Sequence, residues 1–314
     1  MKFLNKKTNI DFMGKRKIAF VVSLILIIGS IVTLVTRDLN FGLDFTGGTL
    51  IEVSYPAAPE VSDVRSNLTD AGMPDAVVQT FGTATDIVVR IPPRESEDES
   101  NAEISTIVLA ALQEGVEGEI TMRRVEFVGP QVGDELTEQG ILAVVYSLIG
   151  IFLYVMIRFQ WRFSVGAVTA LVHDIIVTLG VLALLHVEFD LTVVAALLAV
   201  IGYSLNDTIV LFDRIRENFP RLRKASPLEV VNTSVNETLS RTLMTSITTL
   251  LVLTALFIFG GEIIHAFAFT LIVGVLVGTY SSIYVASTTL LELGVSKFDL
   301  LAVEKEGVAI DENP

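Results

Sequence analysis

The stretch AVIGYSLNDTIVLFDRIREN, residues 199–218, places an amide and a carboxylate inside an apolar run. Up to Phe212 the stretch has the character of a hydrophobic helix, yet Asn206 and Asp207 interrupt it. Burying an ionised carboxylate in an apolar medium costs free energy, so such residues usually face a bundle interior or water. The surroundings of Asp207 therefore decide the fold, and the rest of the chain indicates what they are.

The composition is typical of a membrane protein. Hydrophobic residues make up 51% of the 314, and the mean hydropathy is +0.63, which is well above that of soluble domains. A helix needs about 20 mostly apolar residues to cross a bilayer. Six stretches are long enough, and four of them contain no charged residue. We predict spans at residues 18–35, 140–157, 163–185, 191–212, 242–261 and 266–291. The chain is therefore expected to be an α-helical membrane protein.

The first apolar stretch follows Lys15, Arg16 and Lys17, as the core of a signal peptide would. It is longer than the apolar core of a typical signal peptide, and no small-residue cleavage site follows it. We therefore expect a retained transmembrane anchor.

Lysine and arginine are unevenly distributed between the loops on the two sides of the predicted spans. Residues 1–17 hold six and residues 213–241 hold six more, whereas the opposite short loops, 186–190 and 262–265, hold none. Cytoplasmic loops of membrane proteins are enriched in these residues. We expect both termini in the cytoplasm and the large segment between the first two spans on the other side.

The large segment, residues 37–137, is acidic. It holds 19 Asp and Glu against six Arg, a net charge of −13 out of −14 for the whole chain. Nucleic-acid binding needs a basic face, so this charge excludes it. The chain has no cysteine, so no disulfide holds this segment together. Nothing in its residues calls for a metal or another cofactor.

The pattern within this segment predicts one small α+β domain. Strand-like and helical stretches follow one another in the order β-α-β-β-α-β, a split ferredoxin-like arrangement. Ser62 is the expected cap of the first helix, and Gly82 with Thr83 forms the expected hairpin turn. The stretches are 49–55, 62–71, 76–81, 86–91, 102–113 and 119–128, with an acidic loop at 94–101. The domain has no histidine and no cysteine, and we interpret it as a binding or spacer domain.

Only Asp174 and Asp207 are charged well inside a predicted span. An Asp at the centre of a membrane helix costs about 2.5–3.5 kcal/mol, so it needs a partner or water. The fourth and fifth spans run antiparallel, which puts Asp207 and Arg241 at similar depth, where they can meet across one helix interface. Thr242 begins a hydroxyl-rich stretch that can support a hydrogen-bonded path.

Each of these features also has a purely structural explanation. Arg241 can serve as an anchor at the membrane interface, and Asp207 can make a static contact between helices. The pair His173 and Asp174 is either a second titratable site or a polar contact. For the Gly-x-x-x-Gly pattern at residues 274–278, close helix packing is the favoured explanation.

The functional hypothesis is proton-driven conformational work. An ionised Asp207 would hold the fourth and fifth spans together through Arg241, and protonation would release that contact. A proton that crosses the membrane supplies about 2.3 kcal/mol per 100 mV, which is enough to bias a helix shift.

At these residues the sequence resembles the SecF family, the smaller membrane subunits of the SecD–SecF complex of bacterial protein export. The similarity extends from the first span to the sixth, in the same order and spacing. Five blocks carry it: FGLDFTGGT (41–49), VGPQVGDEL (128–136), VHDIIVTLG (172–180), YSLNDTIVLFDRIREN (203–218) and SRTLMTS (240–246).

The resemblance implies a resistance-nodulation-division-type bundle of six spans with one periplasmic ferredoxin-like domain, in the bacterial cytoplasmic membrane. It implies SecD and the SecYEG channel as partners, and a translocating polypeptide as substrate. Asp207 and Arg241 match the charged positions that the family uses in proton flow. The role of Asp174 is less defined. Asn206 and Thr242 are expected to serve as further relay residues or as polar support for the pair. The implied division is 1–17 cytoplasmic, 18–36 span one, 37–137 periplasmic, 138–291 spans two to six and 292–314 an acidic cytoplasmic tail.

Within the block at 41–49, Gly42, Asp44, Gly47 and Gly48 are expected to shape the turn that joins the first span to the domain, since glycine adopts positive φ readily. This role needs no bound ligand.

Three other functions compete with this one. Two aspartates on adjacent spans suit an intramembrane aspartyl protease, although the Tyr-Asp and Gly-x-Gly-Asp signatures of those enzymes are absent. A proton-driven exporter of small molecules or lipids uses a related bundle, but such pumps carry two six-span halves in one chain. A passive assembly subunit would move no proton.

Overall fold

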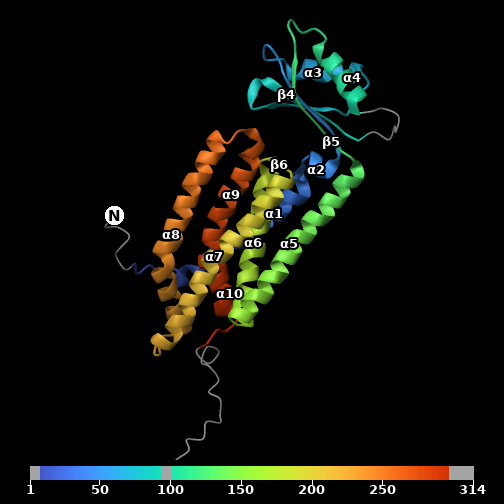
Figure 1. Cartoon of the computed structure of the whole chain (residues 1–314). Coiled ribbons are helices and arrows are strands. Elements are labelled where there is room, and N and C mark those ends of the chain that lie inside the picture. Colours follow the sequence, from blue (N-terminus) through green and yellow to red (C-terminus); the bar gives the residue numbers. More distant parts are fainter. Residues whose placement is uncertain (1–7, 94–100, 297–314) are drawn as a thin grey trace, which may run out of the picture.

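The computed structural model describes residues 8–93 and 101–296. These residues form a bundle of long helices with a small α+β domain at one end (Figure 1). Some of the predicted features lie outside the described residues. These are the acidic loop except for residue 101, most of the acidic tail, and Lys2, Lys6 and Lys7.

Six helices of the bundle are long and apolar enough to cross a membrane, and each overlaps nearly all of one of the six predicted spans. The chain is therefore a multi-pass membrane protein, as its composition predicts. After the short 3-10 turn η1 (Met13–Lys15), the helices are α1 (Arg16–Arg37), α5 (Pro130–Arg158), α6 (Trp161–Leu184), α7 (Leu191–Arg221), α8 (Pro227–Phe259) and α9 (Glu262–Ser281), the last continued by the π-helical turn η2 (Ser282–Ala286) and α10 (Ser287–Glu292).

Three of these helices extend well beyond their apolar stretches. The second span was predicted to begin at residue 140, but α5 already begins at Pro130. The fourth span was predicted to end at Phe212, but α7 continues to Arg221, and α8 begins at Pro227, long before Thr242. The start of α8 is fixed by a capping box, in which Ser226 and Glu229 satisfy each other's backbone N–H groups and Pro227 occupies the first turn. Together α7 and α8 form a helical hairpin that projects at the end of the bundle away from the α+β domain (Figure 1).

The centre of the bundle is formed by α6 and α7. Of the most apolar part of each helix, 56% is buried in α6 and 50% in α7, against 6% in α5 and 17% in α1 and α8. Helix α9 packs closely on α7, because a side chain at Gly274 would overlap Val200 and one at Gly278 would come within 3.0 Å of Ser204. This is the close packing predicted from the Gly-x-x-x-Gly pattern.

The α+β domain has one four-stranded antiparallel sheet in the order β3-β4-β2-β5. Its apolar core lies between the sheet and two helices and includes Ile51, Val53 and Val89 from the strands and Leu68 and Leu112 from the helices. The predicted order β-α-β-β-α-β is present. The elements are β2 (Gly48–Ser54), α3 (Val61–Asp70), β3 (Val77–Phe81), β4 (Thr83–Ile91), α4 (Asn101–Gln113) and β5 (Thr121–Val128).

Two local predictions for this domain need correction. Ser62 is not the cap of α3: the helix begins one residue earlier, at Val61, after Glu60 in an extended conformation. The hairpin is also tighter than predicted, because β4 begins at Thr83 and only Gly82, with φ of +72°, separates it from β3. A glycine adopts this conformation without steric cost.

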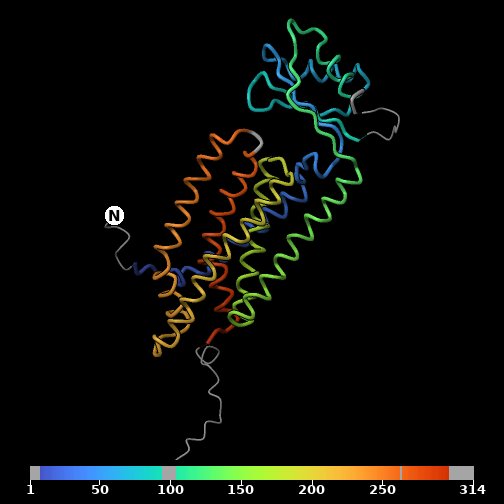
Figure 2. The backbone as a smooth tube through the Cα atoms, in the orientation of Figure 1, coloured from blue at the N-terminus to red at the C-terminus, as the bar shows by residue number. Residues whose placement is uncertain are grey.

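The α+β domain is joined to the bundle by short elements that the sequence patterns did not predict. After α1 the chain forms β1 (Asn40–Phe41) and the single turn α2 (Leu43–Thr46). Strand β1 pairs in parallel with β6 (Glu188–Phe189), the link between α6 and α7. The smooth trace in Figure 2 shows this junction at the end of the bundle that carries the domain. The base of the domain thus holds the start of α7.

Candidate functional site

Asp207 lies on α7 and is 4% exposed. Two side chains of α8 lie near it: Arg241, which acts through its positive charge, and Thr245, whose hydroxyl bonds the Arg241 and Thr242 carbonyls. Because α7 and α8 are neighbours in an antiparallel hairpin, the predicted proximity of Asp207 and Arg241 is present in the fold. Thr245 lies one helical turn after Arg241, within the predicted hydroxyl-rich stretch.

Asp207 and Arg241 do not form a closed ion pair. Among the described residues no salt bridge within 4.0 Å joins them, and Arg241 is exposed on the surface of this chain. The hypothesis that the ionised pair clamps the two helices therefore does not describe this conformation. The guanidinium influences the carboxylate from a distance and remains accessible to another group.

The other predicted supporting residues lie apart from this carboxylate. Asn206 is exposed, and its side chain forms no hydrogen bond within the described part of the chain. Thr242 is 5% exposed, and its backbone carbonyl accepts a 2.9 Å hydrogen bond from the Thr245 hydroxyl. Thr245, rather than the predicted Thr242, therefore supplies the hydroxyl that lies near Asp207.

Asp174 is held in the middle of the bundle, where it is 1% exposed. Its Oδ2 atom accepts hydrogen bonds from Ser204 of α7 at 2.6 Å and from Ser281 of α9 at 2.8 Å. Its Oδ1 atom lies 3.1 Å from Nδ1 of His173. Neither serine was predicted from the sequence, although Ser204 lies in the stretch 199–218, one turn before Asp207.

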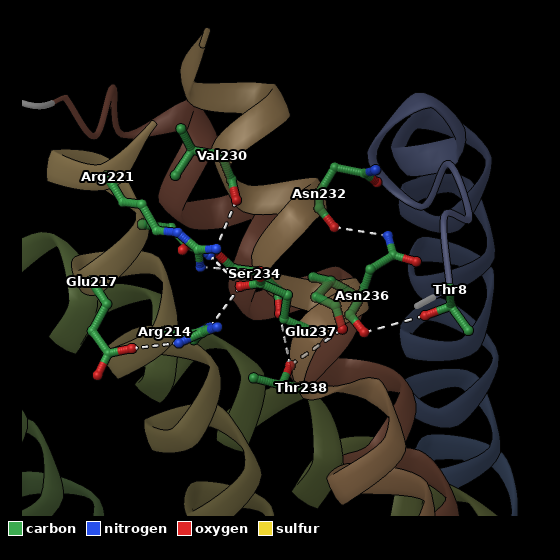
Figure 3. A network of polar contacts seen from close by, with 12 residues as sticks. Thr8, Arg214, Glu217, Arg221, Val230, Asn232, Ser234, Asn236, Glu237 and Thr238 are labelled. Carbon is green, nitrogen blue, oxygen red and sulfur yellow. Dashed lines mark hydrogen bonds and ion pairs between the residues drawn. The ribbon is translucent and has the colours of Figure 1, made fainter. Parts of the chain in front are cut away.

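A polar network ties α7 to α8 beyond the apolar part of the hairpin (Figure 3). Arg214 of α7 donates from Nε to Glu237 of α8 at 2.6 Å. The buried Asn218 donates to both Ser234 and Glu237, at 3.0 and 2.7 Å. Glu237 lies one turn before Arg241, so this network fixes how the Arg241 side of α8 is aligned with the Asp207 side of α7.

Residues 8–12, the first that the structure describes, are attached to the same helix, α8. Asn236 accepts a 2.8 Å hydrogen bond from the backbone N–H of Ile10, and Asn232 accepts one of 2.9 Å from Phe12. Thr8 donates to the Asn236 carbonyl at 3.2 Å (Figure 3). Residues 8–13 are thus docked against α8 on the hairpin side of the bundle.

The glycines of the block at 41–49 have two different roles. Gly47 and Gly48 have φ of +66° and +115°, as expected of a turn that only glycine accepts easily. Gly42 has an ordinary φ of −73°. It is needed for close approach instead, because a Cβ there would lie 3.1 Å from Asp190 and from Glu188.

Asp44 does more than shape this turn. Its Oδ2 atom accepts a 2.9 Å hydrogen bond from the backbone N–H of Leu191, the first residue of α7. Beside it, Arg90 of the domain donates to Glu188 at 2.5 Å and to the Phe41 carbonyl at 3.2 Å. Burial raises the pKa of Glu188, with Asp190 and Asp44 adding to the rise and Arg90 opposing it.

Comparison with known families assigns the chain to a family. Residues 108–296 match the family model described as protein export membrane protein SecD/SecF, C-terminal, and residues 32–55 match the SecD/SecF GG motif. This chain is a member of the SecD/SecF protein-export family. The second match contains Gly47 and Gly48, which is the pair with positive φ.

Curated relatives in the SecD/SecF family agree over nearly the whole chain. Proteins named Protein translocase subunit SecF are 54% identical in Vibrio alginolyticus, over 99% of both chains, and 50% identical in Pseudomonas aeruginosa, over 97% and 98%. In Escherichia coli O157:H7 the identity is 46% over 95% of this chain and 92% of the relative. These names describe a subunit of a protein translocase, which is a transport role.

Two solved structures have the same fold. The crystal structure of SecDF, a translocon-associated membrane protein from Thermus thermophilus, is 36% identical, with a TM-score of 0.83 over 93% of this chain. A structure of SecDF in a Super-membrane-facing form is 38% identical, with a TM-score of 0.67 over 91%. This chain spans 39% of the length of each. The predicted fold, a six-span bundle with one α+β domain, is confirmed.

Proposed function

We propose that this chain is an accessory subunit of the Sec translocase, which uses proton flow together with a SecD-type partner to assist late steps of polypeptide export. Membership of the SecD/SecF family supports the export role. The observation that carries the proton-driven part is the position of Asp207, buried in a membrane helix beside a cation that does not neutralise it by direct contact.

This arrangement suits a carboxylate that changes its protonation state. An ionised Asp207 attracts Arg241 and strengthens the α7–α8 contact, whereas a protonated Asp207 does not. Two packings of the hairpin then differ in energy according to the bound proton. A proton that crosses the membrane contributes about 2.3 kcal/mol per 100 mV, which is comparable to the energy of such a contact.

Movement of α7 would reach the α+β domain directly. The first residue of α7 is bonded to Asp44, and the strand before it, β6, is paired with β1 at the base of the domain. The Arg90–Glu188 ion pair adds a third connection across the same junction. A shift of α7 along or about its axis would therefore be passed to the domain rather than absorbed in a loop.

A partner in the membrane would explain the exposure of two polar side chains. Asn206 and Arg241 lie in or next to the apolar parts of α7 and α8, and both are exposed on this chain. Polar groups that face lipid are costly, so such residues usually face protein or water. A second subunit with its own carboxylate would cover them. The solved SecDF chains, of which this chain spans 39%, support SecD as that subunit.

The proposed orientation places both termini in the cytoplasm and the α+β domain in the periplasm. It rests on the arginine-rich hairpin, whose Arg214, Arg221 and Arg223 lie at the end of the bundle away from the domain. In this orientation the domain lies where an exported polypeptide emerges from SecYEG, the channel beside which we place the complex.

Single-cysteine cross-linking tests the partner, because the chain has no cysteine of its own. Asn206→Cys in native membranes is expected to cross-link to a SecD-like chain that also co-purifies with the wild-type protein. Ile25→Cys on α1 is 64% exposed in the unsubstituted chain and serves as the matched control that does not cross-link. Equal cross-linking at both positions, or none to a SecD-like chain, would refute the proposed interface.

A proton-driven exporter of small molecules or lipids is the remaining alternative of this kind. Its support is the bundle fold alone. Reconstituted vesicles distinguish the two functions: the export subunit accelerates the release of a secretory polypeptide in the presence of SecYEG and a proton gradient, whereas an exporter would expel a small substrate without SecYEG.

A further inference from the structure

The Asp174 carboxylate joins three helices at the centre of the bundle. It belongs to α6, and it accepts hydrogen bonds from Ser204 of α7 and Ser281 of α9. Both hydroxyls reach the same atom, Oδ2, which leaves Oδ1 for Nδ1 of His173 at 3.1 Å. An ionised Asp174 suits this geometry, because both hydroxyls can donate to Oδ2, and in its Nδ1–H tautomer His173 can donate to Oδ1.

The other ring nitrogen of His173 has no partner within the described residues. Its Nε2 atom is buried and makes no hydrogen bond, and the whole residue is 2% exposed. With the proton on Nδ1, Nε2 carries a free lone pair. A buried acceptor without a partner is costly, so it calls for a ligand that can donate a proton or a hydrogen bond.

His173 lines a cavity of about 590 Å³ between α1, α6 and the η2–α10 segment. The cavity extends along α10 to Glu292, at the end of the bundle opposite the α+β domain. Its wall is mainly apolar, but Thr169 lies one turn before His173, and Thr288 and Thr289 lie one turn before Glu292. Water that enters from this end could follow these hydroxyls toward His173.

The ionisable groups around the pair are few. The ring of Tyr280 of α9 lies tilted beside the His173 ring, with 6.1 Å between the ring centres, but its hydroxyl is bonded to Ala19 and Ser23 of α1. Tyr284 of η2 and Glu292 of α10 lie on the cavity wall. From α7 the pair meets Ser204, with Asp207 one turn further along. Among the described residues no lysine or arginine is paired with Asp174.

We propose that His173 and Asp174 form a second proton-binding site, which exchanges one proton with water in the cavity. This inference rests on the proposed proton-driven function and deepens it. On uptake, a water-borne proton forms an N–H bond at Nε2, while the Nδ1 proton moves to Oδ1 of Asp174. The pair changes from one negative charge to none, and the histidine changes from its Nδ1–H to its Nε2–H tautomer. Release reverses both steps.

The Ser281 hydroxyl has two possible acceptors, and a change of acceptor would couple the proton exchange to movement of α9. The Ser281 hydroxyl has one proton, and it can donate it to Asp174 at 2.8 Å or to the Gly278 carbonyl at 3.2 Å. A neutral carboxylic acid is a weaker acceptor than a carboxylate, so uptake shifts Ser281 toward Gly278. The π-helical turn η2 begins at the next residue, and such turns often occur at functional sites. Ser204 conveys the same change to α7, one turn before Asp207.

The tautomer of His173 tests the proposal directly. The chain has three histidines, so selective ¹⁵N-histidine labelling of the full-length protein in lipid nanodiscs gives three sets of ring signals, and His173→Gln assigns one of them. We expect His173 to change from the Nδ1–H to the Nε2–H tautomer as the pH falls. Asp174→Asn is expected to abolish the change, and Ser281→Ala to move the pH at which it occurs.

Ser164→Ala on the same helix is the matched control and is expected to leave the change where it is. Within the described residues the Ser164 hydroxyl bonds only the Gln160 carbonyl. A His173 that keeps one tautomer over the whole pH range in which the protein stays folded would overturn the proposal. The result does not depend on export activity or on proton flux through Asp207. A failure of this inference is therefore distinguishable from a failure of the proposed function.

Discussion

The carboxylate of Asp44 accepts a 2.9 Å hydrogen bond from the backbone N–H of Leu191. Asp44 belongs to the glycine-containing block that leads into the α+β domain, and Leu191 is the first residue of α7, the helix that carries Asp207. The domain therefore holds the end of the helix on which the proposed proton chemistry takes place. Each part of this connection can be tested separately.

Asp44→Ala removes the acceptor for the Leu191 amide. A lost contact of this kind at a helix start costs about 1 kcal/mol, so α7 should begin to fray without unfolding. We expect faster hydrogen exchange at the start of α7 and a reduced rate of secretory export at normal protein levels. Asp44→Asn keeps an acceptor oxygen and should retain most of both properties. Equal exchange in Asp44→Ala and wild type would show that the contact is dispensable.

Glu188 makes the junction sensitive to pH. Because burial raises its pKa, the folded protein holds a proton there more tightly than the unfolded chain does. Its contribution to stability is present at or below the ordinary glutamate pKa and falls as the pH rises through the raised value. We expect thermal unfolding of the purified protein to show this decline between acidic and neutral pH, and Glu188→Gln to flatten it. An unchanged slope in Glu188→Gln would contradict the assignment.

Gly48 is expected to be intolerant of any side chain. Its φ is +115°, and a Cβ would run into the Ile91 carbonyl of the neighbouring strand. Gly72 also has a positive φ, of +82°, but has open space around it. Gly48→Ala should therefore destabilise the domain by about 1–3 kcal/mol more than Gly72→Ala. Protease resistance of the domain measures the difference. Equal resistance of the two variants would show that the strand contact does not matter.

The contact between α7 and α9 depends on Gly274. A Cβ at this position would overlap Val200, a branched side chain that cannot easily move aside. Gly274→Ala is expected to destabilise the bundle by about 1–3 kcal/mol, and Val200→Ala in the same chain should restore most of the loss. Gly150→Ala on α5 has no neighbour within 4 Å and should be neutral. Thermal unfolding in detergent compares the three, and a tolerated Gly274→Ala without rescue would reject the close contact.

The bundle and the order of elements in the domain could be predicted because each depends on a local pattern. Apolar stretches of sufficient length predict membrane helices, and alternating strands separated by a glycine turn predict a hairpin. The ends of α7 and α8 could not be placed in this way. Beyond Phe212 and before Thr242 both helices continue as amphipathic hairpin arms. Arg214, Glu237 and the capping box at Ser226 hold them on the polar side, and buried apolar residues such as Ile215 and Val231 pack between them, a pattern too interrupted by charge to be identified as a membrane span.

The candidate site was predicted in part. The proximity of Asp207 and Arg241 follows from the antiparallel order of two adjacent spans, a property of topology. The partners of Asp174 follow from side-chain geometry between three helices, α6, α7 and α9. Which faces of these helices meet is not encoded in a local pattern, so neither Ser204 nor Ser281 could be assigned. The role of Asp44 at the start of α7 was hidden for the same reason, because the contact joins residues 147 positions apart.

Proton flux through vesicles that contain this chain with its SecD-like partner tests the central claim most directly. A gradient across the vesicle membrane is expected to drive proton flux in the wild type, and Asp207→Asn is expected to reduce it to the level of empty vesicles while the complex stays assembled. Asp75→Asn, the same chemical change on the exposed surface of the domain, should leave the flux intact. Undiminished flux in an assembled Asp207→Asn complex would contradict the account.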